Sequence, residues 1–97
     1  MITRIIKRQI LSILKYQGVT KAAIFGSFAT GEHKRKSDID LLVTFKRYPS
    51  LLDISSLKIK LEKKIGKKFD VITYDSIYPS LKKTILKEQK IIYEKRP

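Results

Sequence analysis

The chain has 97 residues, with 22 Lys or Arg, 9 Asp or Glu, one His and no Cys. That length suits one domain, so we expect residues 1–97 to form a single domain. Without Cys there are no disulfides, thiolate metal sites or Cys nucleophiles, and a lone His makes zinc chemistry a poor fit. No apolar run approaches the ~18 residues of a membrane span, and basic residues interrupt the segment 1–15. We therefore expect a soluble, cytoplasmic protein without a membrane partner.

The formal net charge of +13 has several explanations that stay open at this point. It fits a nucleic-acid partner, an acidic protein or a phosphate-rich ligand. It also fits a compositional bias toward Lys and Ile, as in some thermophiles. The Lys-rich face expected on residues 50–65 carries no interleaved aromatic residues, so we do not expect direct nucleic-acid binding.

The first half of the chain predicts a helix followed by two strands. Apolar residues recur at three- and four-residue spacings over 2–17, which is typical of an amphipathic helix, and Gly18 can end it. The apolar run 21–25 predicts a buried strand that stops at Gly26, with room for one helical turn at 28–30. Residues 39–45 are rich in β-branched and aromatic side chains and predict a second strand.

The second half predicts two helices and two further strands. Ser50 and Asp53 resemble a capping box at the start of a helix over 50–65, which Gly66 ends. Residues 69–74 predict a third strand, 78–87 a short helix, and 90–94 a last strand at the edge of the sheet. This order predicts an α/β fold in which helices pack on a small mixed sheet.

Two acidic residues at the start of the second strand are the first candidates for chemistry. Asp38 and Asp40 are two positions apart, so both carboxylates point to one face, and the residues after them are apolar. The two carboxylates repel each other unless a cation lies between them. Mg²⁺ or Mn²⁺ would suit this position, because both ions prefer oxygen ligands. The alternative is ordinary turn or capping chemistry at Ser37 and Asp38.

The sequence Gly26-Ser27 follows the first strand and precedes the expected helical turn. Glycine lets the backbone approach a ligand closely, and exposed N–H groups at a helix start favour phosphate. Ser27 adds a hydroxyl donor. The alternative is a plain strand-to-loop turn in which Ser27 caps the helix.

A third acid, Asp70, begins the third strand. If that strand neighbours the second, its carboxylate completes a three-acid cluster, and two divalent ions would nearly neutralise it. Asp75 is the competitor for the third place. It lies at the far end of the same strand in a turn-like sequence, so we favour Asp70.

These residues together resemble a known family. Gly26-Ser27, ten residues and then Asp38-x-Asp40 are similar to the GS-x10-D-x-D signature of the polymerase-beta-like nucleotidyltransferases. The small size, the N-terminal helix and the ending 86–93 resemble the minimal nucleotidyltransferases in particular. The resemblance covers essentially the whole chain.

The resemblance implies a protein adenylyltransferase that uses ATP and two Mg²⁺ ions. In that family the Gly-Ser turn binds the β- and γ-phosphates, which implies this role for Gly26 and Ser27. It likewise implies Asp38, Asp40 and Asp70 as metal ligands. The resemblance also implies an antitoxin that transfers AMP to a hydroxyl, expected to be a Tyr, of a HEPN toxin, an all-α RNase. Pyrophosphate would be released.

One position departs from the family pattern. Many members have Arg where Thr30 stands, which affects phosphate affinity or anchoring of the loop. Residues 34–36, Lys-Arg-Lys, are candidates to compensate, although a solvated charge run is the plainer interpretation of them and of His33. Two other functions stay open: an antitoxin that neutralises its partner by binding alone, and a nucleotidyltransferase acting on a small molecule or RNA.

Overall fold

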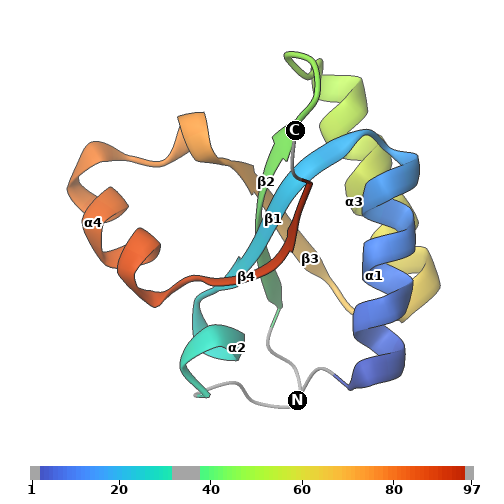
Figure 1. The fold of residues 1–97 in the computed structure, drawn as a ribbon, viewed down its shortest axis with the longest axis horizontal. Coiled ribbons are helices and arrows are strands. Elements are labelled where there is room, and N and C mark those ends of the chain that lie inside the picture. The colour runs from blue at the N-terminus through green and yellow to red at the C-terminus, as the bar shows by residue number, and fades with distance from the viewer. Residues whose placement is uncertain (1–2, 32–37, 96–97) are drawn as a thin grey trace.

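The computed structural model describes residues 3–31 and 38–95, which form four strands and the helices that cover them (Figure 1). In chain order the elements are α1 (Arg4–Tyr16), β1 (Val19–Phe25), α2 (Ser27–Thr30), β2 (Ile39–Phe45), α3 (Leu51–Ile65), β3 (Phe69–Thr73), the 3₁₀ turn η1 (Tyr74–Ser76), α4 (Pro79–Glu88) and β4 (Lys90–Glu94). The predicted α/β fold is confirmed. Within these described stretches, no helix is both long enough and apolar enough to cross a membrane.

The four strands form one mixed sheet in the order β3-β2-β1-β4. β1 pairs antiparallel with β2 and with β4, so the predicted edge position of the last strand is confirmed. β2 and β3 run parallel, connected by α3, and their register places Asp40 beside Asp70. The neighbouring strands on which the three-acid hypothesis depended are therefore present.

The two faces of the sheet are covered unequally. One face packs under α1 and α3, where the main core contains the β2 residues Ile39, Leu41 and Val43 (Figure 1). The opposite face has a smaller apolar cluster of Ala23, Leu42 and Ile77, and α4 contributes no fully buried residue. Since side chains alternate along a strand, Asp40 shares the thinly covered face of Leu42.

Strand β1 begins at Val19, two residues before the predicted start. Val19 is 2% exposed and pairs with Phe45, with an irregularity in the register between Val19 and Lys21. The polar residues Thr20 and Lys21 interrupt the apolar run, so the sequence pattern alone did not reveal this first pair. The described bounds of α1 are Arg4–Tyr16, with Thr3 as the N-cap: its side chain accepts from the backbone N–H of Ile6.

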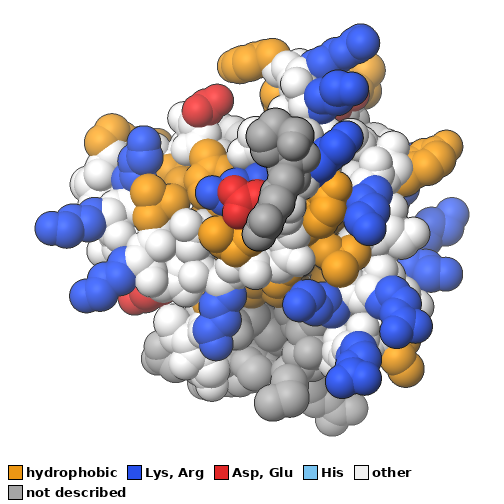
Figure 2. Space-filling model, viewed as in Figure 1, with side chains coloured by type: hydrophobic (Ala, Val, Ile, Leu, Met, Phe, Trp, Pro, Cys, Tyr) orange, Lys and Arg blue, Asp and Glu red, His pale blue; other side chains and the backbone are white. Residues whose placement is uncertain are grey.

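The basic residues are spread over the molecule. Figure 2 shows Lys and Arg side chains at several separate places on this face, with few acidic side chains between them. Among the described residues the structure contains one ion pair, between Lys21 and Glu94 at 4.0 Å. Most Lys and Arg side chains of the described part are exposed, so they can attract an anionic partner.

The predicted capping box of α3 is present. The Asp53 backbone N–H donates to Ser50 Oγ at 3.1 Å, and the Ser50 N–H donates to Asp53 Oδ2 at 2.8 Å. Gly66 ends the helix with a left-handed φ of 78°, a conformation in which other residues are strained. Both ends of α3 thus follow from local sequence.

Removing this cap has a measurable cost. We expect Ser50→Ala to lower the free energy of unfolding by about 1 kcal/mol, because the Asp53 N–H loses its acceptor. Ser55 is exposed on the same helix, so Ser55→Ala serves as the control and is expected to change stability by less than ~0.5 kcal/mol. Urea unfolding followed by circular dichroism measures both; equal effects would contradict the capping argument.

Candidate active site

Asp40 lies at the centre of the candidate site. It is the second residue of β2, opposite Phe25 of β1 on one side and beside Asp70 of β3 on the other. Its side chain is half-buried, whereas Asp38, just before the strand, and Asp70 are exposed. The start of the β2–β3 pair therefore places the acids in a position open to a ligand.

The three acids interact electrostatically. Burial raises the pKa of the Asp40 carboxyl above its ordinary value of 3.8, and the negative charges of Asp70 and Asp38 raise it further. A carboxylate surrounded in this way favours any cation that relieves the repulsion. The structure thus brings Asp38, Asp40 and Asp70 within electrostatic reach of one another.

The turn after β1 packs directly against Asp40. Gly26 has a left-handed φ of 72°, and a Cβ added there would clash with Asp40 Oδ2 and lie 3.2 Å from its Cγ. The Gly26 carbonyl accepts hydrogen bonds from the backbone N–H groups of Ala29 and Thr30, both at 3.1 Å, and from Thr30 Oγ1 at 3.3 Å. Gly26 is therefore required both for its conformation and for the space it leaves to a carboxylate.

Some predicted site residues lie outside the described part. Ser27 is the first residue of α2, but its side chain is among those not described, so its phosphate role stays a prediction. His33 and the basic residues 34–36 lie in the undescribed segment 32–37. Thr30, the position that departs from the family pattern in the sequence analysis, is exposed in α2.

The donor chemistry of the site fits Mg²⁺, although the side chains do not form a closed cage. Carboxylate oxygens are the ligands that hard divalent cations prefer, and the pKa of Asp40 is raised first by burial and then by the charges of Asp70 and Asp38. Over residues 3–31 and 38–95, no group of three or more Asp, Glu, His or Cys side chains is arranged to hold a metal ion. Three carboxylates that repel one another need a cation, or a small rotamer change, to converge.

Asp75, the competitor for the third acid, is located elsewhere. It lies in η1, beyond the last residue of β3, whereas Asp70 is the second residue of that strand. Four residue steps separate Asp70 from Tyr74, about 13 Å of strand. The geometry therefore favours Asp70, as the sequence did.

The chain matches the model of a known protein family. The family model described as "Polymerase beta, Nucleotidyltransferase" matches residues 8–97, which is most of the chain. The chain belongs to this nucleotidyltransferase family. The match includes Gly26, Ser27 and the three acids, so the resemblance inferred from the spaced signature is confirmed at the level of the family.

Two relatives are similar over most of their length. A Methanocaldococcus jannaschii protein, provisionally named a protein adenylyltransferase, is 54% identical over 83 residues, covering 86% of this chain and 89% of its own. The protein adenylyltransferase MntA of Thermococcus cleftensis is 39% identical over 71 residues, covering 73% of this chain and 72% of its own.

Solved structures share the fold. A toxin–antitoxin crystal structure with AMP-PNP superposes with a TM-score of 0.81 at 21% identity, covering 93% of this chain and 74% of the other. A Shewanella oneidensis complex of a tri-AMPylated HEPN toxin with an MNT antitoxin gives 0.74 at 17% identity, covering 94% and 71%. At these identities the likeness establishes the nucleotidyltransferase fold.

In this nucleotidyltransferase we expect the charged Asp40 carboxylate to lower the stability of the folded chain. Because the folded-state pKa of Asp40 is raised, the folded chain binds this proton more readily than the unfolded chain. The free energy of unfolding contributed by Asp40 therefore falls as pH rises above ~4. We expect Asp40→Asn to be more stable than wild type at pH 7, with the difference shrinking as pH falls toward 3.8.

Urea unfolding at a series of pH values measures this effect. Asp75→Asn, an exposed change outside the site, is the control and is expected to alter stability by less than ~0.5 kcal/mol. A destabilised Asp40→Asn at pH 7 would show that its carboxylate is held by favourable contacts instead of crowded by like charges.

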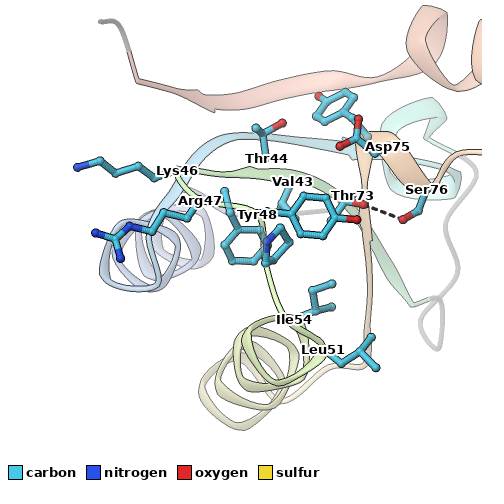
Figure 3. Close-up of a pocket in the computed structure, with 13 residues that line it drawn as sticks. Val43, Thr44, Lys46, Arg47, Tyr48, Leu51, Ile54, Thr73, Asp75 and Ser76 are labelled. Atoms are coloured by element: carbon cyan, nitrogen blue, oxygen red, sulfur yellow. Dashed lines mark hydrogen bonds between the residues drawn. The ribbon is translucent and has the colours of Figure 1, made fainter.

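A pocket of about 550 Å³ at the other end of β2 and β3 was not predicted from the sequence (Figure 3). Its walls come from the end of β2, the β2–α3 loop, the start of α3 and η1. Val43, Phe45 and Ile54 give it apolar surface, and Thr73 and Ser76 contribute hydroxyls that hydrogen-bond to each other at 2.7 Å. No motif marks it, because its residues converge only when the parallel strands pair.

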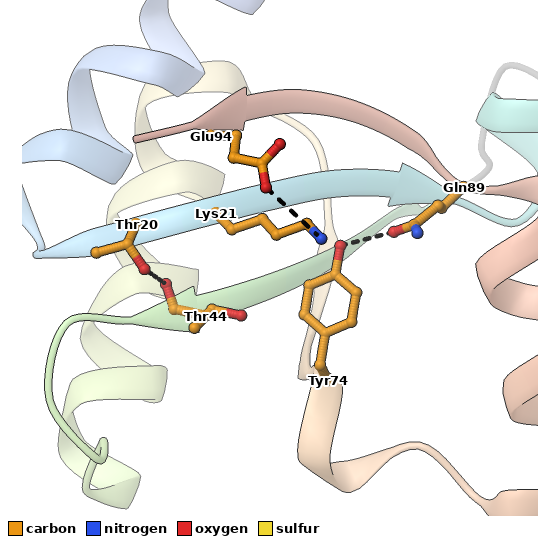
Figure 4. Close-up of polar contacts among 6 residues, drawn as sticks. All are labelled: Thr20, Lys21, Thr44, Tyr74, Gln89 and Glu94. Atoms are coloured by element: carbon orange, nitrogen blue, oxygen red, sulfur yellow. Dashed lines mark hydrogen bonds and ion pairs between the residues drawn. The ribbon is translucent and has the colours of Figure 1, made fainter. Parts of the chain in front are cut away.

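A polar cluster on the thinly covered face was also missed (Figure 4). Tyr74 donates to Gln89 Oε1 at 2.6 Å, and Lys21 Nζ lies 5.0 Å from the centre of the Tyr74 ring. Burial raises the pKa of Tyr74 above 10, and the charge of Glu94 raises it further. These contacts connect η1 to the β1 and β4 edge, and they stabilise the segment that leads into α4.

Proposed function

We propose that this chain is an antitoxin of the minimal nucleotidyltransferase type, acting over residues 1–97 as one domain. It transfers AMP from ATP to a hydroxyl, expected to be a Tyr, of a partner toxin of the HEPN family. The observation that carries the proposal is the Gly26 turn packed against Asp40, with Asp70 in register beside it. The relatives named protein adenylyltransferases support the reaction class.

The chemistry follows from the acids and the turn. Mg²⁺ held by Asp38, Asp40 and Asp70, with two ions expected, would neutralise the triphosphate and lower the pKa of the attacking hydroxyl. The Gly26-Ser27 turn binds the β- and γ-phosphates through the start of α2. The hydroxyl oxygen bonds to the α-phosphorus, the bond to the bridging oxygen breaks, and pyrophosphate leaves. We expect Asp70 to accept the hydroxyl proton.

We expect the acceptor hydroxyl to belong to a second protein. Residues 3–31 and 38–95 form one sheet with its covering helices, and these described residues include no separate acceptor-binding domain. The Shewanella oneidensis complex pairs an MNT antitoxin with an AMPylated HEPN toxin, which supports the same kind of partner here. The net charge of +13 suits an acidic protein surface.

The test is transfer of label from α-labelled ATP to the protein encoded by the adjacent gene. We expect label on that protein with Mg²⁺, and none after EDTA is added, because the uncompensated carboxylates then repel the triphosphate. Label that resists EDTA would contradict the metal assignment. A partner that is bound and silenced without label would contradict the transfer reaction.

A second candidate function is neutralisation by binding alone. Two features favour it: Thr30 departs from the Arg of the family pattern that the sequence resembles, and no preformed three-acid cage exists within the described residues. The two functions separate cleanly, because a binding antitoxin still silences the toxin when Asp38 and Asp40 are replaced with Asn.

A further inference from the structure

The loop between β2 and α3 carries an unusual group of exposed side chains. We define the β2–α3 tip as Lys46, Arg47, Tyr48, Leu51 and Leu52. Tyr48 is 91% exposed, Leu51 84% and Leu52 81%, although all three are large and apolar. Apolar and basic side chains protrude together at the top of the view in Figure 2, where Figure 1 places this loop.

Neither the hydrophobic core nor the active site uses these exposed side chains. The core of α3 is made by Leu57 and Leu61, which are fully buried, while Leu51 and Leu52 project from its first turn. Asp40 is five residues from Phe45, so the tip lies roughly 17 Å along β2 from the acids. Exposed large apolar side chains grouped in five residues indicate a contact surface.

The pocket of about 550 Å³ opens beside the tip and could accept a side chain of a binding partner. Tyr48 and Leu51 line this pocket together with Val43 and Ile54 (Figure 3). Binding hot spots in protein interfaces combine such pockets with projecting Tyr, Arg and apolar anchors. The tip offers both parts: side chains that insert into a partner and a hollow that accepts one.

Charge decides which occupant fits. Lys46 and Arg47 form no ion pair with any residue in the described part of the chain. A second copy of this +13 chain would bring like charges together at the tip, which disfavours self-association. Two of the three apolar side chains are Leu, which cannot stack on bases, so a nucleic acid fits poorly. A protein with acidic groups around an apolar side chain fits best.

We propose that the β2–α3 tip docks the protein that receives AMP. An apolar side chain of that partner enters the pocket, its carboxylates face Lys46 and Arg47, and Tyr48 and Leu51 insert into its surface. This inference rests on the proposed function and adds the docking surface to it. A partner held at the tip has to extend about 17 Å along the sheet to present its hydroxyl at Asp70, a span that a folded domain covers.

The test uses the full chain and the purified protein encoded by the adjacent gene. We expect Tyr48→Ala/Leu51→Ser to raise the dissociation constant for the partner about 30-fold, the effect of losing a hot-spot residue. The matched control is Ile5→Ser/Ile59→Ser, because Ile5 is 70% and Ile59 60% exposed, on α1 and in the middle of α3. The control is expected to stay within ~3-fold of wild type.

Salt dependence gives a second readout. We expect Lys46→Ser/Arg47→Ser to slow association and to flatten its dependence on ionic strength, because these cations steer an acidic partner. An unchanged salt dependence would remove the charge part of the proposal. Circular dichroism and urea unfolding verify that every variant is folded.

Failure of this proposal is distinguishable from failure of the proposed function. Asp38→Asn/Asp40→Asn tests transfer and is expected to keep the partner bound. The tip variant is expected to bind the partner about 30-fold more weakly while its affinity for Mg²⁺–AMP-PNP is unchanged. Equal partner binding by tip variant, control and wild type would overturn the docking surface. A tip variant that instead abolishes self-association or RNA binding would also overturn it, in favour of a second copy or a nucleic acid.

Discussion

Replacing Asp38 and Asp40 together with Asn is expected to lower AMP transfer at least about 100-fold. Removing a residue that only hydrogen-bonds to a metal ligand lowers metal affinity or activity roughly 10- to 100-fold. This change removes two carboxylates that the proposed ions would bind directly. The pKa of Asp40 is already raised by burial and by its acidic neighbours, so the neutral amides relieve repulsion and leave the fold intact. The loss should therefore be one of chemistry alone.

The measurement is label transfer from α-labelled ATP beside partner binding by calorimetry. We expect Asp70→Asn to lose transfer activity as the double variant does. Asp75→Asn, in η1 at the other end of β3, is the matched control. Because Asp75 lines the pocket beside the tip, the partner is added at saturating concentration, and this control should then retain most of the activity. If Asp75→Asn inactivates and Asp70→Asn does not, the third acid has been misassigned. If the Asp38→Asn/Asp40→Asn variant transfers AMP like wild type, the proposed metal site is wrong.

Gly26→Ala is expected to reduce transfer about 100-fold by displacing the Asp40 carboxylate. The added Cβ would clash with Asp40 Oδ2, so either the turn or the carboxylate has to move. A misplacement near 1 Å in a catalytic geometry costs on the order of 100-fold. The left-handed φ of 72° adds a destabilisation of about 1–2 kcal/mol for any residue with a Cβ.

Gly18→Ala separates these two effects. Gly18 has a φ of 80°, so it has the same conformational cost, but a Cβ there meets no atom within 4 Å. We expect both variants to lose similar unfolding free energy and only Gly26→Ala to lose transfer activity. Comparable activity losses in the two would assign the effect to stability, and the contact with Asp40 would then have no catalytic meaning.

The predicted elements were recovered where local chemistry defines them. The capping box of Ser50 and Asp53 and the left-handed Gly66 specify α3 through contacts within four residues, which the sequence displays directly. The start of β1 was placed two residues late, because Val19 joins the sheet through Phe45, a residue 26 positions away. Propensity carries no information about such a partner.

The exposure of Leu51 shows the same limit on a helix. Leu51 precedes Ile54 by three residues, a spacing that places both on one side of the helix, yet Leu51 is 84% exposed. Figure 1 shows the first turn of α3 at the top of the molecule, where the strands end, so this turn has no sheet to pack on. Periodicity gives the direction of a side chain, but the length of the neighbouring element determines whether anything lies there.

By itself the sequence determined the family, the candidate acids and the glycine turn, because a spaced signature such as Gly26-Ser27 to Asp38-x-Asp40 records chemistry within a short stretch of chain. Only the tertiary structure decided that Asp70 stands beside Asp40, that Gly26 leaves room for its carboxylate, and that a pocket opens beside Tyr48. Each of these depends on strand order and register. Those are set by long-range packing of the whole sheet, which no local pattern encodes.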